Sequence, residues 1–133
     1  MRRADWVDQM WRTIEMRNGE AFEYGASDCC LLVADVLDSI HGGDLRSQIL
    51  ADYHDEKTAH DLVARFHGLH GAITHYLGAS APAHHARRGD AVLVAVGDGV
   101  ERCGICVGDG VVCAGDGVIV YPLNTVVCCW RVD

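Results

Sequence analysis

Cys29 is the residue whose position in this sequence most favours chemistry. The polar pair Ser27-Asp28 precedes it and a long apolar run follows, which places Cys29 in the first turn of a predicted helix. The backbone N–H groups and the positive end of the helix dipole can stabilise a thiolate there and lower the pKa of the thiol. Cysteine hydrolases combine such a nucleophile with a histidine base and a third, orienting group. Cys29 is therefore the candidate nucleophile, and a buried structural cysteine is the alternative.

The eight histidines offer few partners for this cysteine. None follows His85, so no strand predicted after that residue carries a histidine base. His84 and His85 lie in a loop before the first predicted strand, from which a side chain could reach Cys29. His60 and His67 fall on a predicted helix and at its end, where we expect solvated side chains.

The remaining cysteines raise the question of a metal site. Cys103 and Cys106 form the one CxxC pair, in a predicted strand where residues three apart point to opposite faces. The adjacent Cys128 and Cys129 diverge in the same way. Zinc would be indicated by two CxxC pairs at a suitable separation, which this sequence lacks. We expect no metal and no cofactor, and most of the seven cysteines should be reduced, buried, small hydrophobic side chains.

Helical spacing dominates the first half of the sequence. An amphipathic helix is predicted over residues 5–17, and Trp6 and Trp11 on its apolar face are expected in the core, as is Trp130. The alternative is that Trp6 and Trp11 are exposed and mark a protein-contact patch. The helix that starts after Asp28 and runs through residue 40 is apolar nearly all round, so it should be buried. Further helices are predicted at 45–50, with Asp44 as the N-cap, at 58–66 and at 71–77, and residues 79–86 are predicted to form a loop.

The pattern changes from helical to extended after residue 89. Gly-Asp-Gly occurs at 97–99, 108–110 and 115–117, and Asp-Gly between apolar runs is typical of hairpins. Strands are predicted at 91–96, 103–107, 111–114, 118–121 and 126–132. The sequence therefore predicts an α+β fold in which N-terminal helices pack on a C-terminal antiparallel sheet.

Composition indicates a single domain over residues 1–133. Apolar residues make up 50% and charged residues 23% of the chain, which is ordinary for a globular protein. The formal net charge of −8 disfavours nucleic acids as partners. The apolar runs fall far short of the ~20 residues that span a bilayer, and the N-terminus lacks a signal-peptide pattern. We expect no nucleic-acid partner, no membrane span, and synthesis in a cytoplasm.

Three blocks of the sequence have counterparts in one known family. They are Phe-Glu-Tyr-Gly-Ala-Ser-Asp-Cys-Cys-Leu-Leu-Val-Ala-Asp at 22–35, Arg-Arg-Gly-Asp-Ala-Val-Leu at 87–93 and Arg-Cys-Gly-Ile-Cys-Val-Gly-Asp-Gly at 102–110. In order and spacing they resemble the NlpC/P60 cysteine peptidases. That family has an aromatic-Gly lead-in to Asp-Cys-Ser-Gly, then Arg-Pro-Gly-Asp-Leu, then His-Val-Gly-Ile-Tyr-x-Gly-Asn-Gly. The chain is most similar to short phage-encoded members found among tail genes.

The resemblance implies a catalytic constellation that this sequence carries only in part. The family's base is the histidine that opens the third block, and Arg102 stands at that position. The family's orienting residue lies on the next strand, where this chain has Cys113. A guanidinium stays protonated, so Arg102 cannot act as a base, although its charge could hold Cys29 as a thiolate.

The resemblance thus implies a papain-like, NlpC/P60-type fold with a degenerate triad. We expect a phage-type tail protein, at the tail tip or in tail assembly, that is made in the bacterial cytoplasm, joins the virion tail and lacks full peptidase activity. Its expected partners are other phage tail proteins. The alternative is an active cysteine peptidase that cleaves peptidoglycan stem peptides with Cys29 and an unrecognised base. A cysteine-based amidase or acyltransferase on another substrate is a third class.

Overall fold

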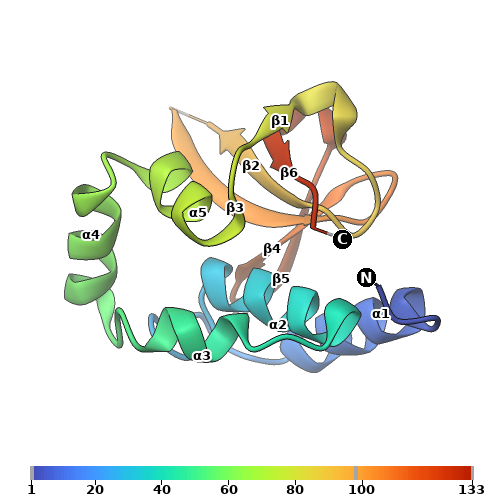
Figure 1. Cartoon of the computed structure of the whole chain (residues 1–133), viewed down its shortest axis with the longest axis horizontal. Helices are drawn as coiled ribbons and strands as arrows, with labels where there is room; N and C mark the ends of the chain where they lie inside the picture. The colour runs from blue at the N-terminus through green and yellow to red at the C-terminus, as the bar shows by residue number, and fades with distance from the viewer. Residues whose placement is uncertain (1, 98, 133) are drawn as a thin grey trace.

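Helices form the first half of the chain (Figure 1). The computed structural model describes residues 2–97 and 99–132. Its helices are α1 (Trp6–Arg17), α2 (Cys29–His41), α3 (Leu45–Leu50), α4 (Glu56–Arg65) and α5 (Leu69–Leu77). Each predicted helix is present, but α4 and α5 begin earlier than predicted. In α4 the reason is a capping box, in which the Asp55 carboxylate accepts from the Thr58 N–H and the Thr58 hydroxyl accepts from the Asp55 N–H.

The second half of the chain forms an antiparallel sheet. Its strands are β1 (Ala81–Pro82), β2 (Ala91–Val96), β3 (Val100–Cys106), β4 (Val111–Gly115), β5 (Gly117–Tyr121) and β6 (Val126–Trp130). They make a six-stranded sheet in the order β1-β6-β2-β3-β4-β5, and each pair is antiparallel. The predicted α+β arrangement, with N-terminal helices packed on a C-terminal antiparallel sheet, is confirmed.

The segment predicted as a loop at 79–86 is partly ordered into regular structure, so that prediction is wrong in part. Ala81 and Pro82 pair with Cys129 and Cys128 to form β1, and a short 3-10 helix follows at Ala83–His85. A strand of this length has no periodicity that a sequence pattern can reveal. The tertiary pairing with β6 defines it.

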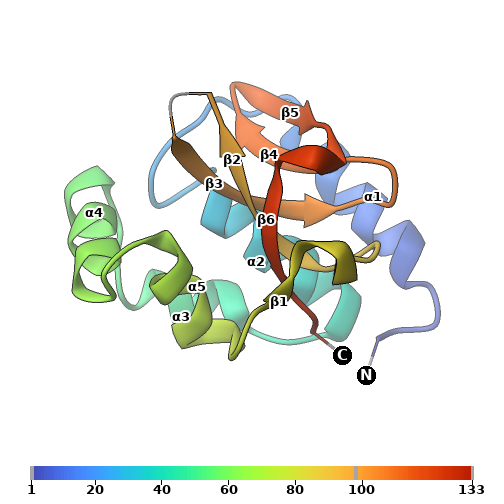
Figure 2. The ribbon, with the colours of Figure 1, turned by 90° about the horizontal axis from the view of Figure 1, so that it is seen from above.

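Helix α2 is the centre of the molecule. It packs against α1 and also against β3 and β4, while α3, α4 and α5 extend to one side of it (Figures 1 and 2). The main core lies between these helices and one face of the sheet, and its largest members include Met10, Leu32, Ile40, Ile105 and Trp130. A second cluster covers the other sheet face, with Val92, Val94, Cys106, Val111, Cys113 and Cys129. The prediction that α2 is buried is confirmed.

The ends of α2 and α3 are fixed by two aspartates. Asp28 caps α2 by accepting a hydrogen bond from the Leu31 N–H at 2.9 Å. The predicted capping of α3 by the Asp44 side chain is wrong, because the Asp44 carboxylate accepts from the Gln48 side chain instead. The free N–H groups of α3 at Leu45 and Arg46 are bound by Asp38 from α2, at 2.7 and 3.0 Å.

The three tryptophans differ in burial. Trp130 is fully buried and donates to the Thr74 hydroxyl at 3.3 Å. Trp6 is partly buried, with the Arg2 guanidinium 4.4 Å from its ring centroid. Trp11 is 41% exposed, so its predicted place in the core is wrong. Helical spacing alone does not say where the apolar face ends.

No helix in the described ranges, 2–97 and 99–132, has both the length and the apolar character required to cross a membrane.

Candidate functional site

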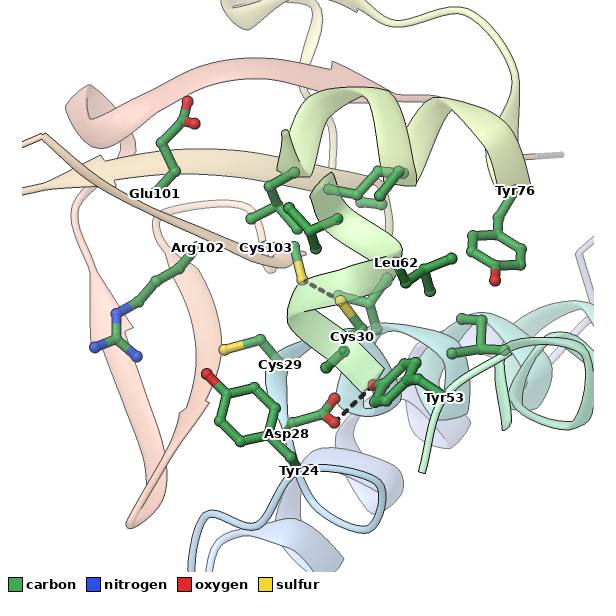
Figure 3. A pocket seen from close by; sticks show the side chains of 18 of the residues that line it. Tyr24, Asp28, Cys29, Cys30, Tyr53, Leu62, Tyr76, Glu101, Arg102 and Cys103 are labelled. Atoms are coloured by element: carbon green, nitrogen blue, oxygen red, sulfur yellow. Dashed lines mark hydrogen bonds between the residues drawn. The ribbon is translucent and has the colours of Figure 1, made fainter. Parts of the chain in front are cut away.

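Cys29 is the first residue of α2 and lies where this helix meets the sheet. The turn before it is held by Asp28, a 97%-buried carboxylate whose partners are the Gly25 N–H at 2.9 Å, the Leu31 N–H at 2.9 Å and the Tyr53 hydroxyl at 2.6 Å. The Cys29 thiol is partly buried and donates to the Ala114 carbonyl of β4 at 3.3 Å. Asp28 therefore fixes the position from which the thiol is presented (Figure 3).

The structure brings the three predicted site residues together. Arg102 on β3 and Cys113 on β4 both interact electrostatically with Cys29, and the side chains of Arg102 and Cys29 extend into the same space in Figure 3. Gly104 makes room for this cluster, because a Cβ at that position would lie 2.6 Å from the Cys113 sulfur. These positions, distant in sequence, therefore form one site.

The place of Cys29 at a helix start does not lower the pKa of its thiol, because burial has the larger effect. Burial, and next the neighbouring Cys30, raise the pKa of Cys29 to about 11, although the charge of Arg102 acts in the lowering direction. Burial and the proximity of Cys29 raise the pKa of Cys113 to about 12. Burial removes water from the sulfur, and this loss disfavours the thiolate more than the Arg102 cation and the N-terminus of α2 stabilise it. Both groups are neutral thiols at physiological pH.

The histidines do not supply the missing base directly. His84 and His85 are exposed in the 3-10 helix and lie outside the pocket lining, so they do not reach Cys29 as considered from the sequence. His67 is exposed after α4. His60 is exposed as expected, yet it also lines the pocket, with its Nε2 3.5 Å from the Tyr24 hydroxyl.

Tyr24 and Tyr53 are site residues that the sequence did not single out. Tyr24 lines the pocket beside Cys29, and its hydroxyl lies on the side of the site where Arg102 extends (Figure 3). Burial, followed by the charge of Glu56, raises the pKa of Tyr24, so its hydroxyl is a donor. Tyr24 belongs to the first of the three blocks and lies five residues before Cys29, so its position in the sequence could have indicated it as a site residue. Tyr53 gave no such signal, because it lies after α3 and meets Asp28 only in the folded chain.

The pocket beside Cys29 has a volume of about 350 Å³. Its walls come from α2, α3, α4, α5 and β3, and its apolar lining includes Val33, Leu62, Val63, Leu69 and Ile73. Arg102, Tyr24 and Cys29 lie together in Figure 3, whereas Leu62 and Tyr76 lie on the far side of Cys30. The pocket therefore has a polar end and an apolar end.

The second block of the resemblance has a structural role. Asp90 is buried, accepts from the Arg87 N–H at 2.9 Å and forms an ion pair with Arg2 at 3.2 Å. Gly89 has a φ of 92°, and a Cβ there would lie 2.9 Å from the Trp6 ring. These residues fix the entry to β2 rather than contribute to the pocket.

The cysteines do not form a metal centre. Cys103 and Cys128 lie in the core on the helical side of the sheet, whereas Cys106 and Cys129 lie in the cluster on the opposite side, as predicted from strand alternation. All seven cysteines are free thiols. Within residues 2–97 and 99–132, no three His, Cys, Asp or Glu side chains are placed to hold a metal ion.

Fold and site together define an α+β domain with a cysteine at the start of its central helix and a pocket beside that cysteine. The chain belongs to the DUF6950 family, a domain of unknown function, whose family model matches residues 1–132. A search of curated proteins gave no match.

Proposed function

We propose that this domain is a phage-type tail protein that uses an NlpC/P60-like, papain-type scaffold for assembly or binding, without full peptidase activity. The convergence of Cys29, Arg102 and Cys113 supports the scaffold, because these are the positions at which that family has its nucleophile, base and orienting residue. The proposed partners are other tail proteins, and the proposed location is the virion tail after synthesis in the bacterial cytoplasm.

The observation that carries the proposal is the chemistry of the Cys29 cluster. Burial raises the pKa of the Cys29 thiol to about 11, and the residues with the largest effects on it are Cys30, Arg102, Ala114 and Asp28, none of which carries an imidazole. Amide hydrolysis requires a base that takes the thiol proton and later donates it to the leaving amine. Arg102 cannot accept a proton, and a neutral Cys113 does not orient a base.

Two measurements test this proposal. Purified protein incubated with peptidoglycan should release no more stem peptide than Cys29→Ala. In the phage genome that encodes the protein, Cys29→Ala should preserve infectious tails, whereas deletion of the gene should abolish them. Stem-peptide release that disappears in Cys29→Ala would overturn the proposal, as would normal tails without the gene.

An active cysteine peptidase that cleaves peptidoglycan stem peptides is the second candidate. The contact between His60 Nε2 and the Tyr24 hydroxyl, at 3.5 Å, favours it, because Tyr24 lies beside Cys29 and could link the thiol to an imidazole. In that case His60→Ala and Tyr24→Phe should each abolish the release that Cys29→Ala abolishes. The exposed His67→Ala should not, and it serves as the control.

A further inference from the structure

Arg102, a half-buried cation, stands at the polar end of the pocket beside Cys29. The Nε of Arg102 is buried and has no hydrogen-bond partner in the described ranges, and no carboxylate there forms an ion pair with this arginine. The thiols that face it, Cys29 and Cys113, are neutral because burial raises their pKa values. A buried donor without a partner is costly, and an anionic ligand would satisfy it.

The carboxylates in the pocket lining do not pair with Arg102. Asp28 is committed to two backbone N–H groups and to the Tyr53 hydroxyl, and its side chain turns toward Tyr53 in Figure 3. Glu101 precedes Arg102 on β3, is exposed, and points away from the guanidinium in the same view. The charge of Arg102 is therefore available to a ligand.

The opposite end of the pocket is suited to hydrocarbon. Its polar groups already have partners within the protein: Tyr53 donates to Asp28, Tyr76 donates to Asp52, and the Cys30 and Cys103 sulfurs lie 3.5 Å apart. The remaining surface there is aliphatic, with Val33, Leu62, Val63, Leu69 and Ile73. The volume of about 350 Å³ is within the range of small-molecule sites.

We propose that this pocket binds an aliphatic monocarboxylate, with the carboxylate on Arg102 and the hydrocarbon chain along the aliphatic wall. The guanidinium fork suits two carboxylate oxygens, and the Tyr24 hydroxyl is a further donor at the same end. The inference goes beyond the proposed function and does not depend on it. Decanoate serves as the probe for such a ligand. A domain that does not bind decanoate could still assemble tails, and a peptidase could still bind it. Failure of the binding test is therefore distinguishable from failure of the proposed function.

The first test compares decanoate with decanol on the full chain, by isothermal titration below the concentration at which either aggregates. We expect one decanoate per chain and affinity that rises from hexanoate to decanoate, because each buried methylene adds to binding. Decanol should bind at least tenfold more weakly, since a hydrogen bond to a charged group is stronger than a neutral one. Equal affinities for decanoate and decanol, or no binding of either, would overturn the proposal, and no protein variant is needed to see this.

The second test assigns the carboxylate to Arg102. Arg102→Gln should weaken decanoate binding roughly tenfold or more and leave the affinity for decanol unchanged. Arg131→Gln removes an exposed arginine that follows β6 outside the pocket lining, and it should change neither affinity. Far-ultraviolet circular dichroism verifies the fold, and Arg102→Lys replaces Arg102→Gln if the latter does not fold, with a smaller expected loss. Decanoate affinity that is unchanged in a folded Arg102 variant would overturn the assignment.

Discussion

At the scale of single residues, the Cys29 thiol is subject to opposing effects. The helix start and the Arg102 charge favour a thiolate at Cys29. Burial against the sheet and the adjacent Cys30 oppose them, and burial has the largest effect. A nucleophile-like position is thus occupied by a thiol whose pKa is raised.

We predict that Cys29 reacts slowly with alkylating reagents. Its pKa of about 11 makes the thiolate fraction at pH 8 roughly a hundredfold lower than that of an ordinary thiol. The rate of iodoacetamide labelling at Cys29, measured by peptide mass spectrometry, should keep rising about tenfold per pH unit up to about pH 11, rather than level off near the ~8.5 of a free thiol. Fast labelling with an apparent pKa below the ~8.5 of a free thiol would contradict the prediction and favour the peptidase.

The same measurement tests the role of Arg102 in this cluster. Its positive charge lowers the pKa of Cys29, so Arg102→Gln should raise that pKa further and slow labelling at every pH below it. Arg131→Gln should leave the profile unchanged. Faster labelling in Arg102→Gln would mean that the guanidinium shields the sulfur from the reagent more than it stabilises the thiolate.

At the scale of elements, α3 shows how a cap can come from another helix. The sequence offered Asp44 at the expected position, yet Asp38 in the last turns of α2 binds the Leu45 and Arg46 N–H groups. The Gly42 residue between them has a φ of 77°, the left-handed conformation that turns the chain back on itself. Asp38 therefore joins two helices and fixes the angle between them.

Substitution of the two aspartates should separate these roles. Asp38→Ala should lower the free energy of unfolding by about 1–2 kcal/mol, because it removes the cap of α3 and leaves two N–H groups without their acceptor. Asp44→Ala should change it by no more than about 0.5 kcal/mol, as an exposed surface substitution. Urea unfolding of both variants measures the difference. A larger loss in Asp44→Ala than in Asp38→Ala would refute the assignment.

The limits of sequence-based prediction are visible in the same elements. Segments such as α2 and β2 were predicted because each is a nearly continuous apolar run, which indicates a buried element. The pairing of Ala81 and Pro82 with β6, and the exposure of Trp11, depend on what lies opposite them in space. In the site, Cys29 was found from its place at a helix start, and Arg102 and Cys113 were found through the resemblance. Tyr53, and the burial that raises the pKa of Cys29, depend on tertiary contacts.

At the scale of the whole molecule, the buried thiols link stability to alkaline pH. Burial is the largest cause of raised pKa values for Cys29, Cys106, Cys113, Cys128 and Cys129. A thiol whose pKa is higher in the folded than in the unfolded state contributes stability below the unfolded value, and that contribution is lost as pH rises. For Cys113, this contribution to stability is lost between pH 9.0, the ordinary pKa of the thiol, and about 12, its pKa in the folded chain.

We therefore predict that the free energy of unfolding falls progressively above pH 9. Each fully buried thiol contributes at most about 1.4 kcal/mol per pH unit in its window. The difference in stability between the wild-type chain and Cys113→Ala should narrow from pH 8 to pH 10.5, because the variant has no thiol to ionise at this site. Val112→Ala, a buried substitution on the same strand, should keep a constant difference from the wild type. Denaturant unfolding under reducing conditions gives these values, and a Cys113→Ala difference that stays constant with pH would mean that this thiol ionises equally easily in the folded and unfolded chains.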